Sequence, residues 1–122
     1  MERLAELTEG LLQLTKEAEH FYIDTVKNDS TYEVDFYGQV KPFADKVQPM
    51  AQEWFPLVKT YLVQNPIKNL HVAQLDQTVE NLDVVAIKSF YPSSGMKRQR
   101  ETFKSVEYVL AHLLEELKND PT

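Results

Sequence analysis

Cysteine is absent from the 122-residue sequence, and glycine occurs only three times. Without cysteine the chain can form no disulfide framework, no thiolate metal site and no cysteine nucleophile. The lack of disulfides fits a reducing compartment, so we predict a cytoplasmic protein. The scarcity of glycine argues against a fold rich in loops or β-turns.

Long apolar runs are also missing. No segment approaches the roughly 18 consecutive apolar residues of a membrane-spanning helix. Residues 1–10 are charged and amphipathic, and they lack the apolar region of a signal peptide. We therefore predict no association with a membrane.

Basic residues are in the minority, with 13 Lys and Arg against 19 Asp and Glu, which gives a formal net charge of −6. Proteins that bind nucleic acid through phosphate contacts normally carry an excess of Lys and Arg. The composition therefore predicts no nucleic-acid partner and mainly indicates solubility. The length predicts a single domain, residues 1–122, that can bury its own core.

The most informative stretch runs from Glu33 to Tyr61. Its apolar residues recur in steps of four and three, which predicts one buried face of a helix. They are Phe36, Val40, Phe43, Val47, Met50, Trp54, Leu57 and Tyr61. Three prolines interrupt this stretch, and a proline inside a helix typically costs about 3 kcal/mol.

Because the apolar spacing does not shift across Pro42, Pro49 or Pro56, we predict one helix that is kinked near Pro42. The alternative is a short helix over residues 32–40, followed by a longer helix with Pro42 at its first position. Both interpretations keep a single continuous apolar face.

Apolar periodicity predicts three more helices, over residues 2–27, 71–90 and 96–118. Ser30 and Glu33 form a candidate capping box for the helix that follows them. Four helices with short connections predict an all-α fold, an antiparallel up-down four-helix bundle whose second helix is proline-kinked.

A basic cluster opens the last predicted helix and is the first candidate binding site. Lys97, Arg98 and Arg100 follow Tyr91 and a short serine-rich turn. A helix N-terminus with nearby arginines can bind an anion through free backbone N–H groups and guanidinium groups. The simpler interpretation, which we favour, is a solvated basic end or a set of ion pairs with acidic residues of other helices.

Two further groups of residues have a structural and a functional interpretation. Polar residues expected to face inward either fix the register of the bundle by hydrogen bonds or line a ligand pocket; they are Gln74, Thr78, Asn81, Ser105 and Tyr108. Trp54 and Phe55 lie beside Pro56, and they belong either to a broad core face or to a surface that binds a partner.

Half of a di-iron carboxylate site is present in Glu17 and His20, which are three residues apart. His71 and His112 have no glutamate three residues before them, so the second half is missing. We predict no metal site, no cofactor and no catalytic residues. The absence of a complete catalytic set favours a protein that is not an enzyme.

The sequence resembles the YppE-like family, a domain of unknown function found in small proteins of Bacillus-type Gram-positive bacteria. The stretches VKPFAD at residues 40–45 and SVEYVL at residues 105–110 carry this resemblance most clearly. Shorter matches are Glu53-Trp54, Gln74, Glu80-Asn81, Ser89-Phe90-Tyr91 and Lys97-Arg98. The resemblance implies a cytosolic four-helix bundle and no activity. Pro49 and Pro56 lie outside the family pattern.

Together these features favour a non-enzymatic module that acts through a protein partner or through self-association. The alternative is a small-ligand or anion-binding protein, or an unrecognised enzyme, that uses the turn from Tyr91 to Arg100. The sequence leaves open the partner, the ligand and the oligomeric state.

Overall fold

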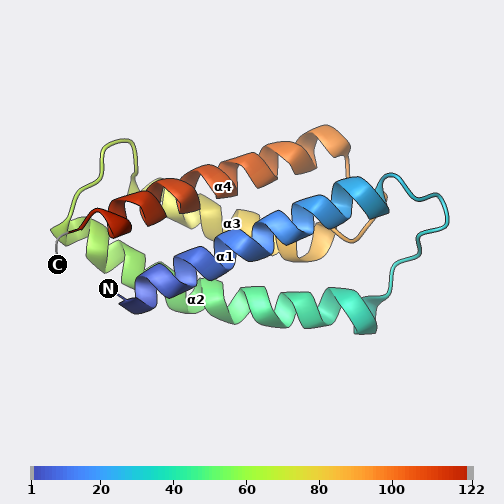
Figure 1. Ribbon diagram of the computed structural model, residues 1–122, viewed down its shortest axis with the longest axis horizontal. Coiled ribbons are helices and arrows are strands. Elements are labelled where there is room, and N and C mark those ends of the chain that lie inside the picture. Colours follow the sequence, from blue (N-terminus) through green and yellow to red (C-terminus); the bar gives the residue numbers. More distant parts are fainter. Residues whose placement is uncertain (1, 121–122) are drawn as a thin grey trace.

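The computed structural model describes residues 2–120 and contains four α-helices that lie side by side (Figure 1). They are α1 (Glu2–Phe21), α2 (Lys41–Gln64), α3 (Val72–Lys88) and α4 (Met96–Lys118). Each helix packs against its neighbours in chain order, and α4 closes the ring against α1. The antiparallel up-down four-helix bundle is confirmed. Residues 2–120 include no helix with the length and apolar character needed to traverse a bilayer.

Two π-helical turns flank the long loop between α1 and α2. The first, η1 (Tyr22–Val26), extends α1, and the second, η2 (Phe36–Val40), leads directly into α2. The predicted capping box at Ser30 and Glu33 is wrong. Instead, the Asp35 carboxylate caps η2 by accepting a hydrogen bond of 2.9 Å from the Gly38 N–H, which satisfies one of the backbone donors that a helix start leaves unpaired.

The loop begins with a local turn that also explains why Ser30 does not cap a helix. The backbone N–H and the hydroxyl of Thr31 both donate to Asp29 Oδ1, at 2.9 and 2.6 Å. An aspartate that bonds to the backbone two residues later is typical of a turn. The chain therefore stays non-helical until it reaches Asp35.

The buried face of α2 differs from the predicted face. With Val40 of η2, its buried residues again follow steps of four and three as far as Tyr61, and they include Ala44, Ala51 and Val58, which the prediction omitted. The buried residues of α2 itself are Ala44, Val47, Ala51, Trp54, Val58, Tyr61 and Leu62. Four of the predicted core residues lie instead at the edge of the core, at intervals of seven residues. We call these four residues, Phe36, Phe43, Met50 and Leu57, the edge stripe.

The side chains of the edge stripe remain partly in contact with solvent. Phe36 is 45% exposed and Leu57 is 38% exposed, whereas Phe43 and Met50 are half-buried. The prediction failed here because it counted bulky side chains, while close packing between helices also needs small residues such as alanine in the core.

The prolines lie on the exposed side of α2, opposite its buried face. Pro42 occupies the first turn of the helix, where a backbone N–H would have no helical partner in any case. Pro49 and Pro56 lie inside the helix and each deprives a carbonyl four residues earlier of its hydrogen bond. Those carbonyls belong to Asp45 and Gln52, which are exposed, so water can replace the missing donor.

The helix therefore runs unbroken from Lys41 to Gln64, as the constant apolar spacing predicted. Its α-helical part begins next to Pro42, as in the alternative prediction, but no loop separates it from η2 (Figure 1). Neither prediction included the π-helical turn.

Candidate functional site

Trp54 belongs to the core and not to a surface for partners. Its side chain is 0% exposed, and its indole N–H donates a hydrogen bond of 3.0 Å to the hydroxyl of Thr8, which is buried on α1. The Thr8 hydroxyl in turn donates to the Leu4 carbonyl at 2.7 Å. The partner-surface interpretation is therefore wrong for Trp54. Phe55 is half-buried, and the Lys59 ammonium lies 5.0 Å from the centre of its ring.

The basic cluster at the start of α4 is split by the fold. Lys97, Arg98 and Arg100 are all exposed, and none of them takes part in an ion pair among residues 2–120. A hollow of about 760 Å³ lies beside the turn, and Tyr91 and Arg98 line it together with Lys88. Lys97 and Arg100 do not line it. The structure thus brings together Tyr91 and Arg98 and separates them from the other two cations.

Hydrogen bonds from two other elements hold the turn that forms one wall of this hollow. The Tyr22 hydroxyl donates to the Ser94 carbonyl at 2.7 Å. The Lys27 ammonium donates to the carbonyls of Pro92 and Ser94 at 2.8 and 3.0 Å. The Ser94 hydroxyl donates to the Lys88 carbonyl at 2.8 Å. These bonds hold the turn in place along one wall of the hollow.

The polar residues expected to face inward converge on a groove of about 370 Å³ between α3 and α4. All five line it: Gln74, Thr78, Asn81, Ser105 and Tyr108. Of these, Thr78 is buried, whereas Ser105 and Tyr108 are exposed. The register-fixing interpretation is therefore wrong for Ser105 and Tyr108. Gln74 has a local role, because its side-chain oxygen accepts a hydrogen bond of 2.6 Å from the His71 N–H at the start of α3.

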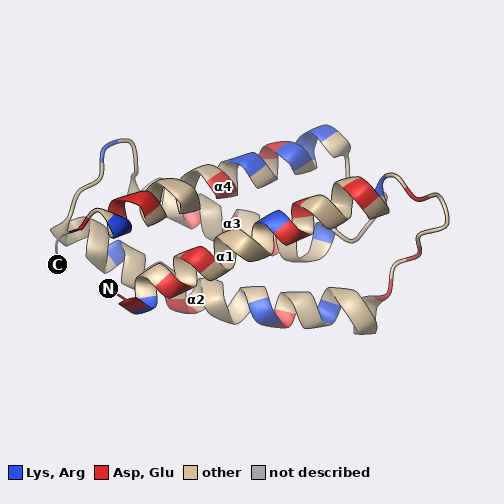
Figure 2. Ribbon diagram, in the orientation of Figure 1, with Lys and Arg blue, Asp and Glu red and all other residues tan. Residues whose placement is uncertain are grey.

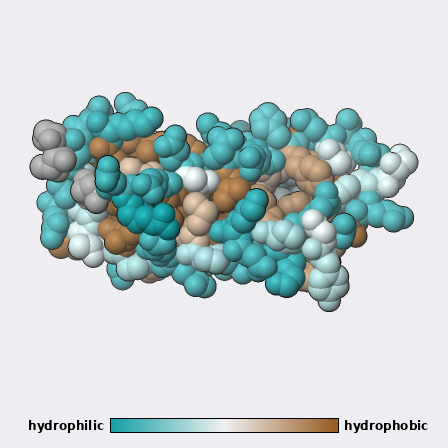
Figure 3. Space-filling view, turned by 60° about the horizontal axis from the view of Figure 1, so that its bottom comes forward, coloured by the Kyte–Doolittle hydropathy of each residue, from teal (hydrophilic) through white to brown (hydrophobic). Residues whose placement is uncertain are grey.

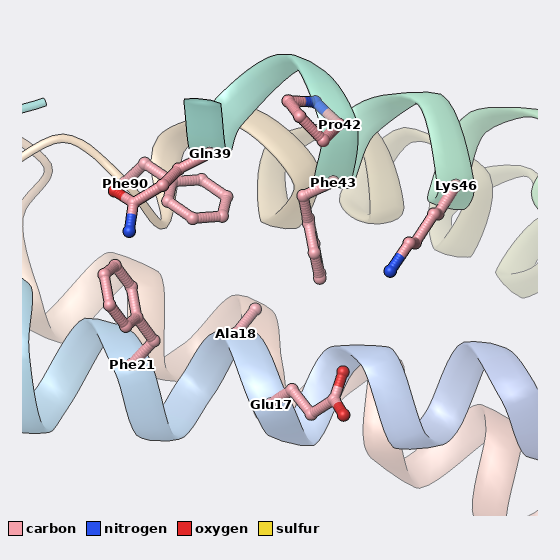
Figure 4. Close-up of a pocket in the computed structure, with 8 residues that line it drawn as sticks. All are labelled: Glu17, Ala18, Phe21, Gln39, Pro42, Phe43, Lys46 and Phe90. Atoms are coloured by element: carbon pink, nitrogen blue, oxygen red, sulfur yellow. The ribbon is translucent and has the colours of Figure 1, made fainter. Parts of the chain in front are cut away.

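A third hollow, of about 340 Å³, lies between α1 and the start of α2 (Figure 4). Three aromatic rings form its apolar part, because the ring of Phe90 lies 5.6 Å from that of Phe21 and 5.4 Å from that of Phe43. Glu17 on α1 and Lys46 on α2 line one end, and their charged groups point toward each other across the opening (Figure 4). Sequence reasoning missed this site, although the seven-residue spacing of the edge stripe was visible.

The edge stripe continues from this hollow along α2. At the middle of the stripe the Met50 side chain packs against Gly10 on α1, since a Cβ atom added to Gly10 would lie 2.6 Å from the Met50 Cε. Beyond this contact, a smaller hollow of about 230 Å³ is lined by Leu57, Arg3 and Tyr61. Apolar side chains reach the surface among hydrophilic ones on this side of the molecule (Figure 3).

We call this side the α1–α2 face: the edge stripe, the two hollows at its ends and the charged residues beside them. Charges of both signs occur on α1 and α2 (Figure 2). The Arg3 guanidinium bonds to both carboxylate oxygens of Glu53, at 2.5 and 2.6 Å. This bidentate pair lowers the pKa of the Glu53 carboxyl, chiefly through the hydrogen bonds from Arg3.

The carboxyl groups of Glu19 on α1 and Glu107 on α4 lie close enough to influence each other. Burial, followed by hydrogen bonding and repulsion from Glu19, raises the pKa of Glu107 to about 7, while Lys16 acts in the opposite direction. The Glu107 Oε2 atom is buried without a hydrogen-bond partner. Glu107 therefore changes its charge in the neutral pH range, where an unperturbed glutamate is fully ionised.

The half-site at Glu17 and His20 does not grow into a larger cluster. The His20 imidazole lies 3.8 Å from the Asp24 carboxylate on the same side of the chain, and both side chains are largely exposed. Within residues 2–120, no group of three or more histidine, aspartate or glutamate side chains is placed to hold a metal ion.

Comparison with known proteins identifies relatives of this fold. A family described as a bacterial domain of unknown function, DUF1798, matches residues 8–117. No curated protein matches the chain.

Three solved structures share the architecture. A protein of unknown function from Listeria innocua is 24% identical, with 97% of this chain and 93% of that chain covered and a TM-score of 0.84. The crystal structure of yppE from Bacillus subtilis is 20% identical, with 97% and 94% covered and a TM-score of 0.86. The solution structure of the same protein is also 20% identical, with 100% and 98% covered and a TM-score of 0.87.

Proposed function

We propose that this chain, which belongs to the bacterial family of unknown function DUF1798, acts without catalysis by binding another polypeptide through its α1–α2 face. We also propose the cytoplasm as its compartment, because the sequence contains no cysteine.

The observation that carries the proposal is the edge stripe. Its four bulky apolar side chains recur every seven residues from Phe36 to Leu57, and all four remain at least partly exposed. At 1.5 Å per residue the stripe is about 32 Å long. A heptad-spaced apolar stripe along a helix is typical of a surface that another helix covers.

The hollows at the two ends of the stripe support the same proposal. Interfaces between proteins commonly place a few bulky side chains in preformed pockets, and those side chains carry much of the binding energy. The hollows of about 340 and 230 Å³ are apolar inside and carry charged residues at their openings. An apolar centre with a polar rim is the usual composition of a protein interface.

Site-specific photo-crosslinking in living cells tests this function. We expect a photo-reactive phenylalanine analogue at Phe43 or at Leu57 to form covalent adducts with another polypeptide. The same analogue at Val63, which is 78% exposed at the far end of α2, should form none, because Val63 lies outside the face. Adding Met50→Lys to the Phe43 probe should remove its adducts, since a charge in the middle of the stripe opposes burial.

Adducts of equal yield from Phe43, Leu57 and Val63 would contradict a specific role for the α1–α2 face. So would adducts at Phe43 that persist when Met50 carries the lysine. Circular dichroism of each purified variant shows whether the bundle is intact, so that loss of adducts can be attributed to the face.

The second candidate function is anion binding in the hollow beside the turn at Tyr91. Its lining includes the cations Lys88 and Arg98 and no acidic residue, and a guanidinium group can bind a phosphate oxygen pair through two parallel hydrogen bonds.

Titration with inorganic phosphate, followed by nuclear magnetic resonance, tests this candidate. We expect Arg98→Gln to weaken binding by at least about tenfold, because Arg98 lines the hollow. Arg100→Gln should change binding little, since Arg100 does not line the hollow. Equal loss in both variants would indicate diffuse attraction to the basic end of α4 and would contradict a site in the hollow.

A further inference from the structure

We infer that the polypeptide bound by the α1–α2 face is a second copy of this chain, with the two α2 helices antiparallel and Met50 on the two-fold axis. This inference rests on the proposed function, because it names the partner of the same face. Two-fold dimers are the commonest oligomers, and they require a surface that is complementary to itself.

The spacing of the edge stripe is self-complementary in this arrangement. When two antiparallel helices meet at Met50, a residue seven positions before it faces a residue seven positions after it in the other copy. Phe43 of each copy then faces Leu57 of the other. Both aromatic–aliphatic contacts and a central contact between the two methionines form at once, so the stripe is covered along most of its length.

The two hollows fit the same arrangement. The larger hollow lies beside Phe43 and the smaller one beside Leu57, on opposite sides of the contact between Met50 and Gly10. The two-fold axis places the larger hollow of one copy opposite the Leu57 end of the other. Leu57, which is 38% exposed in the single chain, can then enter a preformed apolar space.

The charges beside the stripe specify the antiparallel direction. Lys46 and Glu53 flank the stripe on the same side, seven residues apart. In antiparallel pairing about Met50, Lys46 of one copy faces Glu53 of the other, and the reverse pair forms as well. Charged residues that flank an apolar stripe commonly set the orientation of paired helices in this way. Parallel pairing would leave Lys46 and Glu53 two turns apart.

The charge balance of the face permits contact with a second copy despite the net charge of the chain. The chain carries a net charge of −6, but the residues beside the stripe include two cations, Arg3 and Lys46, against the carboxylates of Glu6, Glu17 and Glu53. Close like-charge contact is therefore largely avoided when two such faces meet.

The absence of cysteine allows a direct test, because single cysteine variants can be linked by a short bismaleimide without side reactions. We expect Met50→Cys to form a covalent dimer by itself. Phe43→Cys and Leu57→Cys should each fail to link alone but should link to each other when the two variants are mixed. Val63→Cys, which is the exposed control on the same helix, should not link in any combination.

Analytical ultracentrifugation of the cysteine-free chain gives an independent measure. We expect a monomer–dimer equilibrium whose dissociation constant rises at least about tenfold in Met50→Lys. Lys46→Glu changes an exposed side chain and should weaken the dimer, because Lys46 faces Glu53 of the other copy; circular dichroism of the variant checks that the new contact with Glu17 of the same chain leaves the bundle intact. Lys59→Glu, away from the stripe on the same helix, should leave the dissociation constant unchanged.

A chain that stays monomeric up to about 1 mM, with no crosslink in any mixture, would overturn the inference. Self-linking of Phe43→Cys would overturn the antiparallel register. If the chain is monomeric while the cellular adducts at Phe43 and Leu57 persist, the proposed function stands and only the identity of the partner is wrong. If the cellular adducts are absent too, both fail.

Discussion

Trp54→Ala should lower the free energy of unfolding by about 3–5 kcal/mol, which is the usual cost of removing a large buried aromatic side chain. Trp54 is 0% exposed and connects α2 to α1 through its hydrogen bond to Thr8. The variant loses the buried apolar area and leaves a cavity that the surrounding helices can fill only in part. Urea denaturation followed by circular dichroism measures the change.

If Trp54→Ala does not fold, Trp54→Phe is the variant to measure. It retains most of the apolar contact but removes the indole donor, so the loss should be smaller, about 1–3 kcal/mol. Val63→Ala, at an exposed position of the same helix, should stay within about 0.5 kcal/mol of the parent. A loss below about 1 kcal/mol for Trp54→Ala would mean that Trp54 does not occupy the centre of the core.

Glu107→Gln should stabilise the protein at pH 8 and have little stabilising effect at pH 4. The folded protein raises the pKa of Glu107 from 4.5 to about 7, so the folded state holds a proton that the unfolded state has released between these values. The contribution of Glu107 to the free energy of unfolding is therefore greatest below about pH 4.5, and it falls as the pH rises toward 7.

Glutamine removes this fall because it stays neutral at every pH and can donate a hydrogen bond to Glu19. We expect a gain on the order of 1–2 kcal/mol at pH 8, a value discounted for partial exposure of the carboxyl group. Denaturation curves between pH 4 and pH 8 measure it. Glu115→Gln, at an exposed position of α4, is the control. It should change the free energy of unfolding little at any pH in this range. If the free energies of unfolding of the parent and of Glu107→Gln change with pH in parallel, the pH dependence does not come from Glu107.

The helices themselves were predictable because their signals are local. The apolar spacing of residues 96–118 and the turn before it gave the bounds of α4 as the structure has them, Met96–Lys118. The bounds of α1 with η1 and of α3 were also within a few residues. Amphipathic periodicity over more than ten residues is the strongest signal in a single sequence.

The orientation of α2 was less predictable because it depends on what the facing helices supply. Ala44 and Ala51 occupy the core, and Phe43 and Met50 lie at its edge. Sequence spacing cannot distinguish two adjacent heptad series when both are apolar. The edge stripe was therefore assigned to the core.

The candidate sites also depend on how separate elements pack, which the sequence does not reveal. Tyr91 and Arg98 lie together because the turn between them is short, whereas the third hollow needs Phe21, Phe43 and Phe90 from three separate elements. The proximity of Glu19 and Glu107 likewise depends on the packing of α1 against α4. No local pattern marks either arrangement.

The prolines on the solvent side of α2 have a consequence for the order of folding. An isolated segment with Pro49 and Pro56 in its interior has little tendency to form a helix, since each proline removes a hydrogen bond during propagation. We therefore expect α2 to become helical only as its buried face docks onto α1 and α3. Substitutions in its core face should then mainly accelerate unfolding, and those in α1 and α4 should mainly slow folding.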